Sequence, residues 1–137
     1  MPLTHTMRNL FAKFTTTEDS TSERFGTTGA YIHVGSGTAS EDPTRNSLAS
    51  TAPSIKAMSA GYPKRNDGTD STGLNILAYR SLFSTDEANH PWEEWMIKNT
   101  TASATGSGTA FNRKLESLGT KPSTQAWQLT ALLEVTT

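Results

Sequence analysis

Alternation of apolar and polar residues near the end of the chain is the feature that most constrains the fold. Over residues 126–135 the apolar positions recur every second residue, at Trp127, Leu129, Ala131, Leu133 and Val135. Successive side chains of a β-strand point to opposite faces, so this pattern predicts a strand with one face in the core and the other mostly toward water. A half-solvated strand of this kind is typical of antiparallel sheets.

Further strands are predicted upstream, at residues 30–34, 55–58, 74–83, 92–99 and 109–117. Turns are predicted at residues 62–68 and 118–123, and an exposed hairpin tip at residues 100–108. Six or seven short strands without intervening helices predict an all-β fold, an antiparallel β-sandwich of jelly-roll or immunoglobulin-like type, over residues 30–137. The expected core residues are Ile32, Val34, Leu74, Ile76, Phe83, Trp95, Ile97, Phe111, Leu115, Trp127, Leu129 and Leu133.

Residues 1–29 are predicted to form an arm that begins with a short helix. After Thr6, a suitable N-cap residue, large apolar side chains recur at the spacing of one helical face. These are Met7, Leu10, Phe11 and Phe14. Two explanations are open: the stripe packs on its own domain, or these four residues dock on a neighbouring subunit. Because Arg8 and Lys13 interrupt the apolar residues, neither a signal sequence nor a membrane span is expected.

Composition argues against several functional classes. The 137 residues include 12 Lys and Arg against 13 Asp and Glu, a formal net charge of -1, and no cysteine. Without cysteine, neither a disulfide scaffold nor a thiolate metal site can form. The near-neutral charge argues against nucleic acid as the main partner. The 23 threonines and 15 serines favour solvent-facing strand positions and long polar loops.

The sequence predicts no catalytic, metal or cofactor site. His5, His33 and His90 are each isolated from other metal-ligating residues. The carboxylates at positions 18, 19, 67 and 70 lack the spacing of a calcium-binding loop. No serine lies in the strand-to-helix turn of a hydrolase. We therefore expect a protein that needs no cofactor and is not an enzyme.

Residues 92–95 place two acids between two tryptophans. Adjacent strand residues point to opposite faces, so Glu93 and Glu94 cannot act together on one bond. We expect Glu94 to make a hydrogen bond or ion pair at a strand edge, and Glu93 to face water. The same rule places Trp92 and Trp95 on opposite faces, which argues against a flat sugar-binding platform and favours a role in the core.

Spaced motifs in the second half resemble a family of small virion proteins of tailed bacteriophages. The motifs lie at residues 79–83, 87–99, 111–114, 118–121 and 127–130, and residues 31–35 and 58–63 fit the same pattern. The pattern is also similar to the N-terminal domains of phage tail-collar fibres, in which an acidic strand end precedes a glycine-containing turn. Here residues 94–99 lack that glycine, and we expect neither a fibre shaft nor a receptor-binding tip.

The resemblance implies a non-enzymatic structural subunit, assembled into the virion in the host cytoplasm. A free-standing domain of this size favours a capsid decoration, or cement, protein that binds and stabilises the shell of the major capsid protein. Its expected partners are that protein and copies of itself in a homo-oligomer such as a trimer, with no nucleic acid and no membrane. The alternatives are a tail or collar adaptor that attaches a fibre, and a small carbohydrate-binding module.

Overall fold

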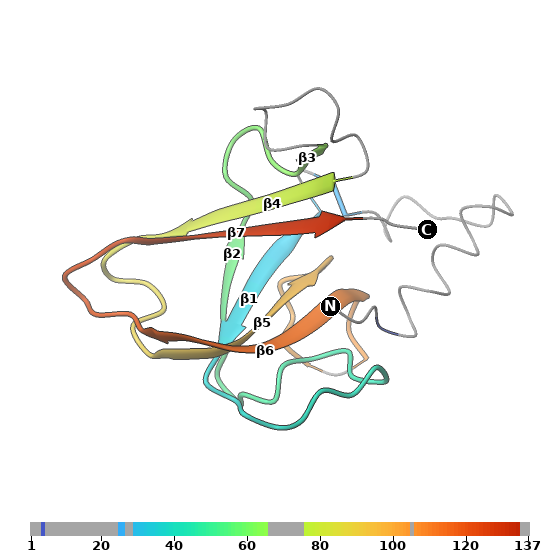
Figure 1. Ribbon diagram of the computed structural model, residues 1–137, viewed down its shortest axis with the longest axis horizontal. Helices are drawn as coiled ribbons and strands as arrows, with labels where there is room; N and C mark the ends of the chain where they lie inside the picture. Colours follow the sequence, from blue (N-terminus) through green and yellow to red (C-terminus); the bar gives the residue numbers. More distant parts are fainter. Residues whose placement is uncertain (1–3, 5–24, 27–28, 66–75, 105, 135–137) are drawn as a thin grey trace, which may run out of the picture.

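Every regular element that the structure describes is a β-strand (Figure 1). The computed structural model describes residues 4, 25–26, 29–65, 76–104 and 106–134. Its strands are β1 (Tyr31–Gly35), β2 (Ser54–Ala57), β3 (Lys64–Arg65), β4 (Ile76–Phe83), β5 (Pro91–Lys98), β6 (Ala110–Thr120) and β7 (Trp127–Glu134). All paired strands run antiparallel. The predicted all-β antiparallel class is therefore confirmed, whereas the predicted N-terminal helix lies outside the described residues.

The strands form two sheets. The two strands of one hairpin come, along the chain, between two strands that pair with each other in the other sheet. Sheet A has the order β2-β1-β5-β6, and sheet B has the order β3-β4-β7. The β5–β6 hairpin belongs to sheet A, and the strands before and after it, β4 and β7, pair with each other in sheet B. The chain therefore crosses between the sheets twice at the same end, through residues 84–90 and 121–126, on the left of Figure 1.

Two stretches that the sequence predicts as turns contain strand residues. Lys64 pairs with Ala78, so β3 forms the edge of sheet B. At the end of β6, Gly119 pairs with Trp92 and Thr120 pairs with Pro91, so this strand extends past residue 117. Both pairings join residues far apart in the sequence, which local turn propensity does not report.

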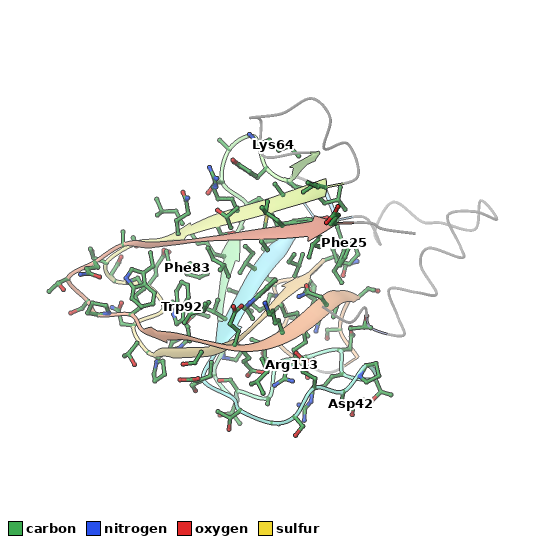
Figure 2. All side chains as sticks on the ribbon, in the orientation of Figure 1. Phe25, Asp42, Lys64, Phe83, Trp92 and Arg113 are labelled. Carbon is green, nitrogen blue, oxygen red and sulfur yellow. The ribbon has the colours of Figure 1, made fainter. Side chains whose placement is uncertain are left out.

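The inner faces of the two sheets share one apolar core. Sheet A contributes Ile32, Val34, Trp92, Trp95, Ile97 and Phe111, and sheet B contributes Tyr79, Phe83, Ala131 and Leu133. Figure 2 shows Phe83 and Trp92 at the end with the two crossings, and Phe25 at the opposite end. Among the expected core residues, Ile32, Val34, Phe83, Trp95, Ile97, Phe111 and Leu133 are buried; Ile76, Trp127 and Leu129 are half-buried; and Leu74 lies outside the described residues.

Leu115 does not lie in the core, where the sequence places it. Its side chain is 36% exposed, and it pairs with Glu94, whose side chain lies on the outer face of sheet A. The cause is a β-bulge: two successive residues of β5 pair with Asn112 and Ala110, which leaves Phe111 between them as an extra residue. The extra residue shifts the alternation of β6, so that Phe111 reaches the core and Leu115 does not.

The buried carboxylate of Glu94 holds residues 36–50 against the outer face of sheet A. It accepts hydrogen bonds from the backbone N–H groups of Gly37, Ala49 and Ser50, at 3.2, 3.0 and 2.7 Å. The approach is close enough that a Cβ at Gly37 would lie 2.6 Å from the Ser50 nitrogen. Only glycine fits there, and both ends of the segment are fixed to one side chain.

Arg113 of β6 pairs with Glu94 and contacts the same segment, residues 36–50. Its Nε donates to Glu94 Oε2 at 2.8 Å, and its two Nη atoms donate to the carbonyls of Ala39 and Ser40 at 2.8 and 3.3 Å. Figure 2 shows Arg113 between the sheet and this segment. The predicted ion pair of Glu94 is therefore present. Glu94 itself lies on an interior strand, since β5 lies between β1 and β6, and its partner Arg113 lies on the outermost strand, β6.

We expect Glu94→Gln to lower the free energy of unfolding by about 3–5 kcal/mol, because it leaves the Arg113 charge buried without a counter-charge. Urea denaturation measures the loss, and hydrogen exchange at the Ala49 and Ser50 amides should accelerate. Glu93→Gln, at the neighbouring and more exposed position, is the matched control and should change stability by less than about 0.5 kcal/mol. Equal losses in both variants would contradict the role of the ion pair.

Candidate docking site

Hydrogen bonds tie the two crossings together. Ala88 adopts a positive φ of 54°, and its carbonyl accepts the His90 N–H at 2.9 Å. The Lys121 N–H donates to the His90 carbonyl at 3.2 Å, and Lys121 Nζ donates to Asn89 Oδ1 at 2.7 Å. Although Lys121 carries a charge, it is only 1% exposed. These bonds fix the two crossings side by side.

Three aromatic rings pack between the sheets at this end. The Trp92 ring meets Phe83 at 5.0 Å and Trp127 at 5.2 Å between centroids, both edge-to-face. Trp92 Nε1 donates to the Ala88 carbonyl at 3.0 Å, so the indole is satisfied although it is buried. Edge-to-face packing is a favoured geometry for aromatic pairs and presents no flat double platform to a ligand.

Trp92 and Trp95 lie on the same face, which contradicts the prediction from their spacing. Both belong to the shared core. The pairing of β5 with β6 is irregular between Trp92 and Glu94, and this irregularity interrupts the strict alternation on which the prediction rests.

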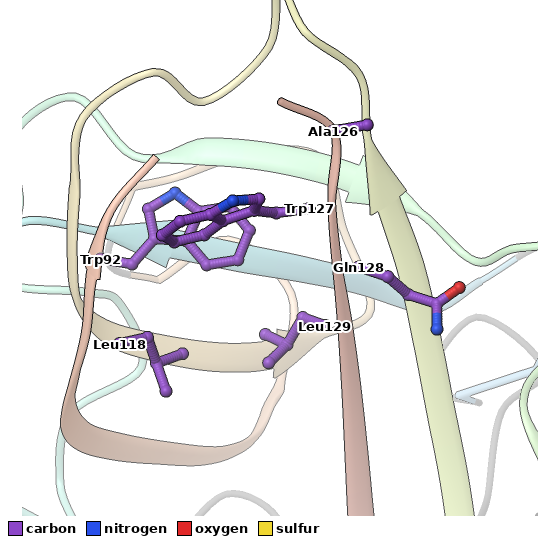
Figure 3. Close-up of a pocket in the computed structure, with 6 residues that line it drawn as sticks. All are labelled: Trp92, Leu118, Ala126, Trp127, Gln128 and Leu129. Atoms are coloured by element: carbon purple, nitrogen blue, oxygen red, sulfur yellow. The ribbon is translucent and has the colours of Figure 1, made fainter. Parts of the chain in front are cut away.

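A pocket of about 390 Å³ opens beside the rings (Figure 3). Its walls are Trp92, Leu118, Ala126, Trp127, Gln128 and Leu129. Figure 3 shows the Trp127 ring reaching toward Trp92, with the side chains of Leu118 and Leu129 next to the rings and Gln128 directed away. The walls are mostly apolar, so the pocket suits an apolar side chain rather than a charged ligand.

The pocket lies between β6 and β7, which are the outermost strands of their sheets. An outermost strand leaves one row of backbone N–H and C=O groups outside the ladder. Leu118 at the pocket is 37% exposed, and Gly119, with a φ of 101°, brings the β6 backbone close to the Trp127 ring. Exposed apolar side chains beside strand edges are characteristic of surfaces that bind another polypeptide.

Sequence reasoning missed a serine–histidine pair. Ser54 Oγ lies 2.9 Å from His90 Nε2, and His90 Nδ1 lies 2.8 Å from the Pro91 carbonyl oxygen. One neutral tautomer satisfies both contacts, with Nδ1–H donating to Pro91 and Nε2 accepting the Ser54 hydroxyl. The geometry resembles a base beside a nucleophile, but a backbone carbonyl stands where a catalytic triad has a carboxylate. The pair joins β2 to the first crossing.

Two basic side chains are buried near the tip of the β5–β6 hairpin. His33 Nε2 contacts the Thr100 carbonyl at 2.9 Å, and Lys98 Nζ donates to the Ala104 carbonyl at 3.0 Å. Burial lowers the pKa of His33 from 6.5 to about 4 and also lowers the pKa of Lys98. His33 is therefore neutral near pH 7 and donates its Nε2–H to the Thr100 carbonyl.

The candidate docking residues Met7, Leu10, Phe11 and Phe14 lie outside the described residues, so their role stays a prediction. Within the described ranges, no three His, Asp or Glu side chains gather closely enough to hold a metal ion. No helix in that part of the chain has the length and apolarity needed to cross a bilayer.

Comparison with known proteins assigns no family. No protein-family model matches the chain, and no curated protein sequence matches it significantly. The resemblance carried by the spaced motifs therefore stays a prediction.

We expect acid to destabilise the protein through His33. Its pKa is lower in the folded state, so the unfolded state binds more protons between about pH 6.5 and pH 4. Stability from this group is complete above about pH 6.5 and is lost as the pH falls toward 4. Urea denaturation should show that this group accounts for about 2 kcal/mol of lost stability between about pH 7 and pH 5.

The matched variant for this experiment is His33→Gln, whose amide can donate to the same carbonyl but does not titrate in this range. The variant should lose the part of the pH dependence that His33 supplies. An unchanged pH profile in His33→Gln would show that another group is responsible.

Proposed function

We propose that this chain is a structural protein of a tailed-bacteriophage virion, most simply a decoration protein that binds and stabilises the major capsid protein shell. The observation that carries the proposal is where the family-like motifs lie. They coincide with the nested strands and crossings: residues 79–83 lie in β4, 87–99 span the first crossing and β5, and 118–121 lead into the second crossing. The motifs that suggest a virion protein thus build the framework around the candidate docking site.

The fold supports the jelly-roll form of a β-sandwich over the immunoglobulin-like form. In the four-strand run from β4 to β7, the outer two strands pair in one sheet and the inner two pair in the other. This nested pairing is the connectivity of a jelly roll, a common architecture of viral coat proteins.

The proposed partners are the major capsid protein and copies of this chain, in a homo-oligomer assembled in the host cytoplasm. Decoration requires only modest affinity at each contact, because many equivalent sites and symmetric neighbours multiply it. No nucleic acid, membrane, cofactor or catalytic step is part of this role. A tail or collar adaptor that attaches a fibre is the alternative, and it uses the same type of docking surface at fewer positions.

We expect Leu10→Asp combined with Phe11→Asp to prevent incorporation into particles while leaving the strands folded, because charges on the apolar stripe block its docking. Asn9→Asp combined with Ala12→Asp is the control, since it adds the same charge on the opposite side of the predicted helix. Quantitative mass spectrometry of purified particles measures the occupancy. Wild-type occupancy of the stripe variant, or equal loss in both variants, would contradict the docking role.

The number of copies per particle distinguishes head from tail. A decoration protein follows the symmetry of the shell and should reach copy numbers in the hundreds, whereas an adaptor follows the tail axis and should be present in a few copies. Immunogold labelling then places the protein on one or the other. A protein that is absent from particles and retained by a glycan array would instead favour the carbohydrate-binding module.

We expect the Ser54–His90 pair to be structural and not catalytic. Wild-type protein and Ser54→Ala should hydrolyse p-nitrophenyl acetate at the same rate, and a fluorophosphonate probe should leave Ser54 unlabelled. Esterase activity that disappears in Ser54→Ala would contradict the non-enzymatic assignment.

A further inference from the structure

We propose that the pocket between β6 and β7 binds one or two side chains of the apolar stripe Met7, Leu10, Phe11 and Phe14 of a second copy of this chain. The inference rests on the proposed function and deepens it, because it names the surface through which neighbouring copies contact each other. Three observations carry it: the chemistry of the pocket, the accessibility of its rim, and the position of the ends of the arm.

The pocket has the chemistry of a receptor for large apolar side chains. The aromatic rings of Trp92 and Trp127 form one part of the wall, and Leu118 and Leu129 form the part beside them. The volume of about 390 Å³ suits one or two side chains of the size of Phe or Leu. Residues 7–14 present four such side chains on one predicted helical face.

The rim of the pocket is accessible because β6 and β7 do not pair with each other. Each ends its own sheet, and Leu118 on β6 is more than one-third exposed. An incoming segment therefore reaches the rings without separating any pair of strands. Helix-in-groove docking needs only a groove with apolar walls and an apolar stripe to fill it.

The residues on either side of the stripe favour a second copy, and not the same chain, as the source of the side chains that enter the pocket. Thr4 is buried, with its Oγ1 donating to the Ala110 carbonyl at 2.5 Å, and the Phe25 ring packs on Phe111 at 5.4 Å. Both contacts lie at the beginning of β6, whereas Leu118 lies about 26 Å further along that strand. With residues 4–6 extended and the predicted helix beginning after Thr6, Phe14 can lie at most about 19 Å from Thr4, short of the pocket of its own chain.

When the arm of each copy binds the pocket of the next, every copy has one donor surface, the stripe, and one acceptor surface, the pocket. When such head-to-tail contacts close, they form a ring, which suits a protein that occupies symmetric positions. Each contact is small, and closure of the ring multiplies its effect.

Thiol crosslinking tests the proposal directly, since the natural chain has no cysteine. Full-length Phe11→Cys protein carrying a size tag is mixed with untagged Leu118→Cys protein and treated with a short bismaleimide. Leu132→Cys is the matched acceptor control, because Leu132 is 54% exposed on a different surface, the outer face of sheet B. We expect the tagged–untagged heterodimer with Leu118→Cys and at least tenfold less of it with Leu132→Cys.

Two outcomes would overturn the proposal. One is equal crosslinking to both acceptors, or to neither. The other is a Phe11→Cys/Leu118→Cys double variant that crosslinks within single chains, which would show that the arm fills its own pocket. Because purified protein is used, a failure here leaves incorporation into particles, and with it the proposed function, as a separate question.

Sedimentation velocity adds a measurement that needs no crosslinker. Leu118→Asp should weaken self-association about tenfold or more, because it places a charge in the apolar wall. Leu132→Asp should change it less than twofold, and circular dichroism checks that both variants stay folded. Equal effects of the two substitutions would count against the pocket as the contact surface.

Discussion

The position of residues 36–50 depends on the buried carboxylate of Glu94. A buried charge is costly unless it is paired and fully hydrogen-bonded, and Glu94 meets both conditions through Arg113 and three backbone N–H groups. These N–H groups belong to a segment without strands or helices between β1 and β2. The segment is thus held on sheet A, and Leu48 packs with Met96 in a second small apolar cluster.

Because residues 36–50 cover sheet A, the outer faces of the two sheets differ in their exposure to solvent. β5 has apolar residues packed on both faces and is buried along most of its length, as expected for a strand with no solvated face. β7 alternates more clearly, and Leu132, like Leu82 on the neighbouring strand, is about half exposed on the outer face of sheet B. The molecule therefore has one sheet shielded by its own chain and one sheet with two leucines facing outward.

The sequence predicts the strands well where one face is solvated, because alternation then follows the pleat. It does not predict which face of the sheet a side chain lies on where the pairing of two strands is irregular. Leu115 lies outside the core, and Trp95 lies on the same face as Trp92. Both differences follow from register shifts between β5 and β6. Contacts between distant residues give no local signal at all. Neither the Ser54–His90 pair nor the burial of Lys121 could be predicted from spacing.

The candidate site follows from topology more than from any motif. β6 and β7 are joined by a short crossing, yet they pair with different partners, so their edges separate as soon as the crossing ends. A strand order in which β6 paired with β7 would close this gap. In the observed order, the gap must be filled by large side chains, and Trp92 and Trp127 fill it only in part, because a pocket remains beside them. The tryptophans thus act both as core residues and as the wall of an opening, which explains why sequence patterns assign them only to the core.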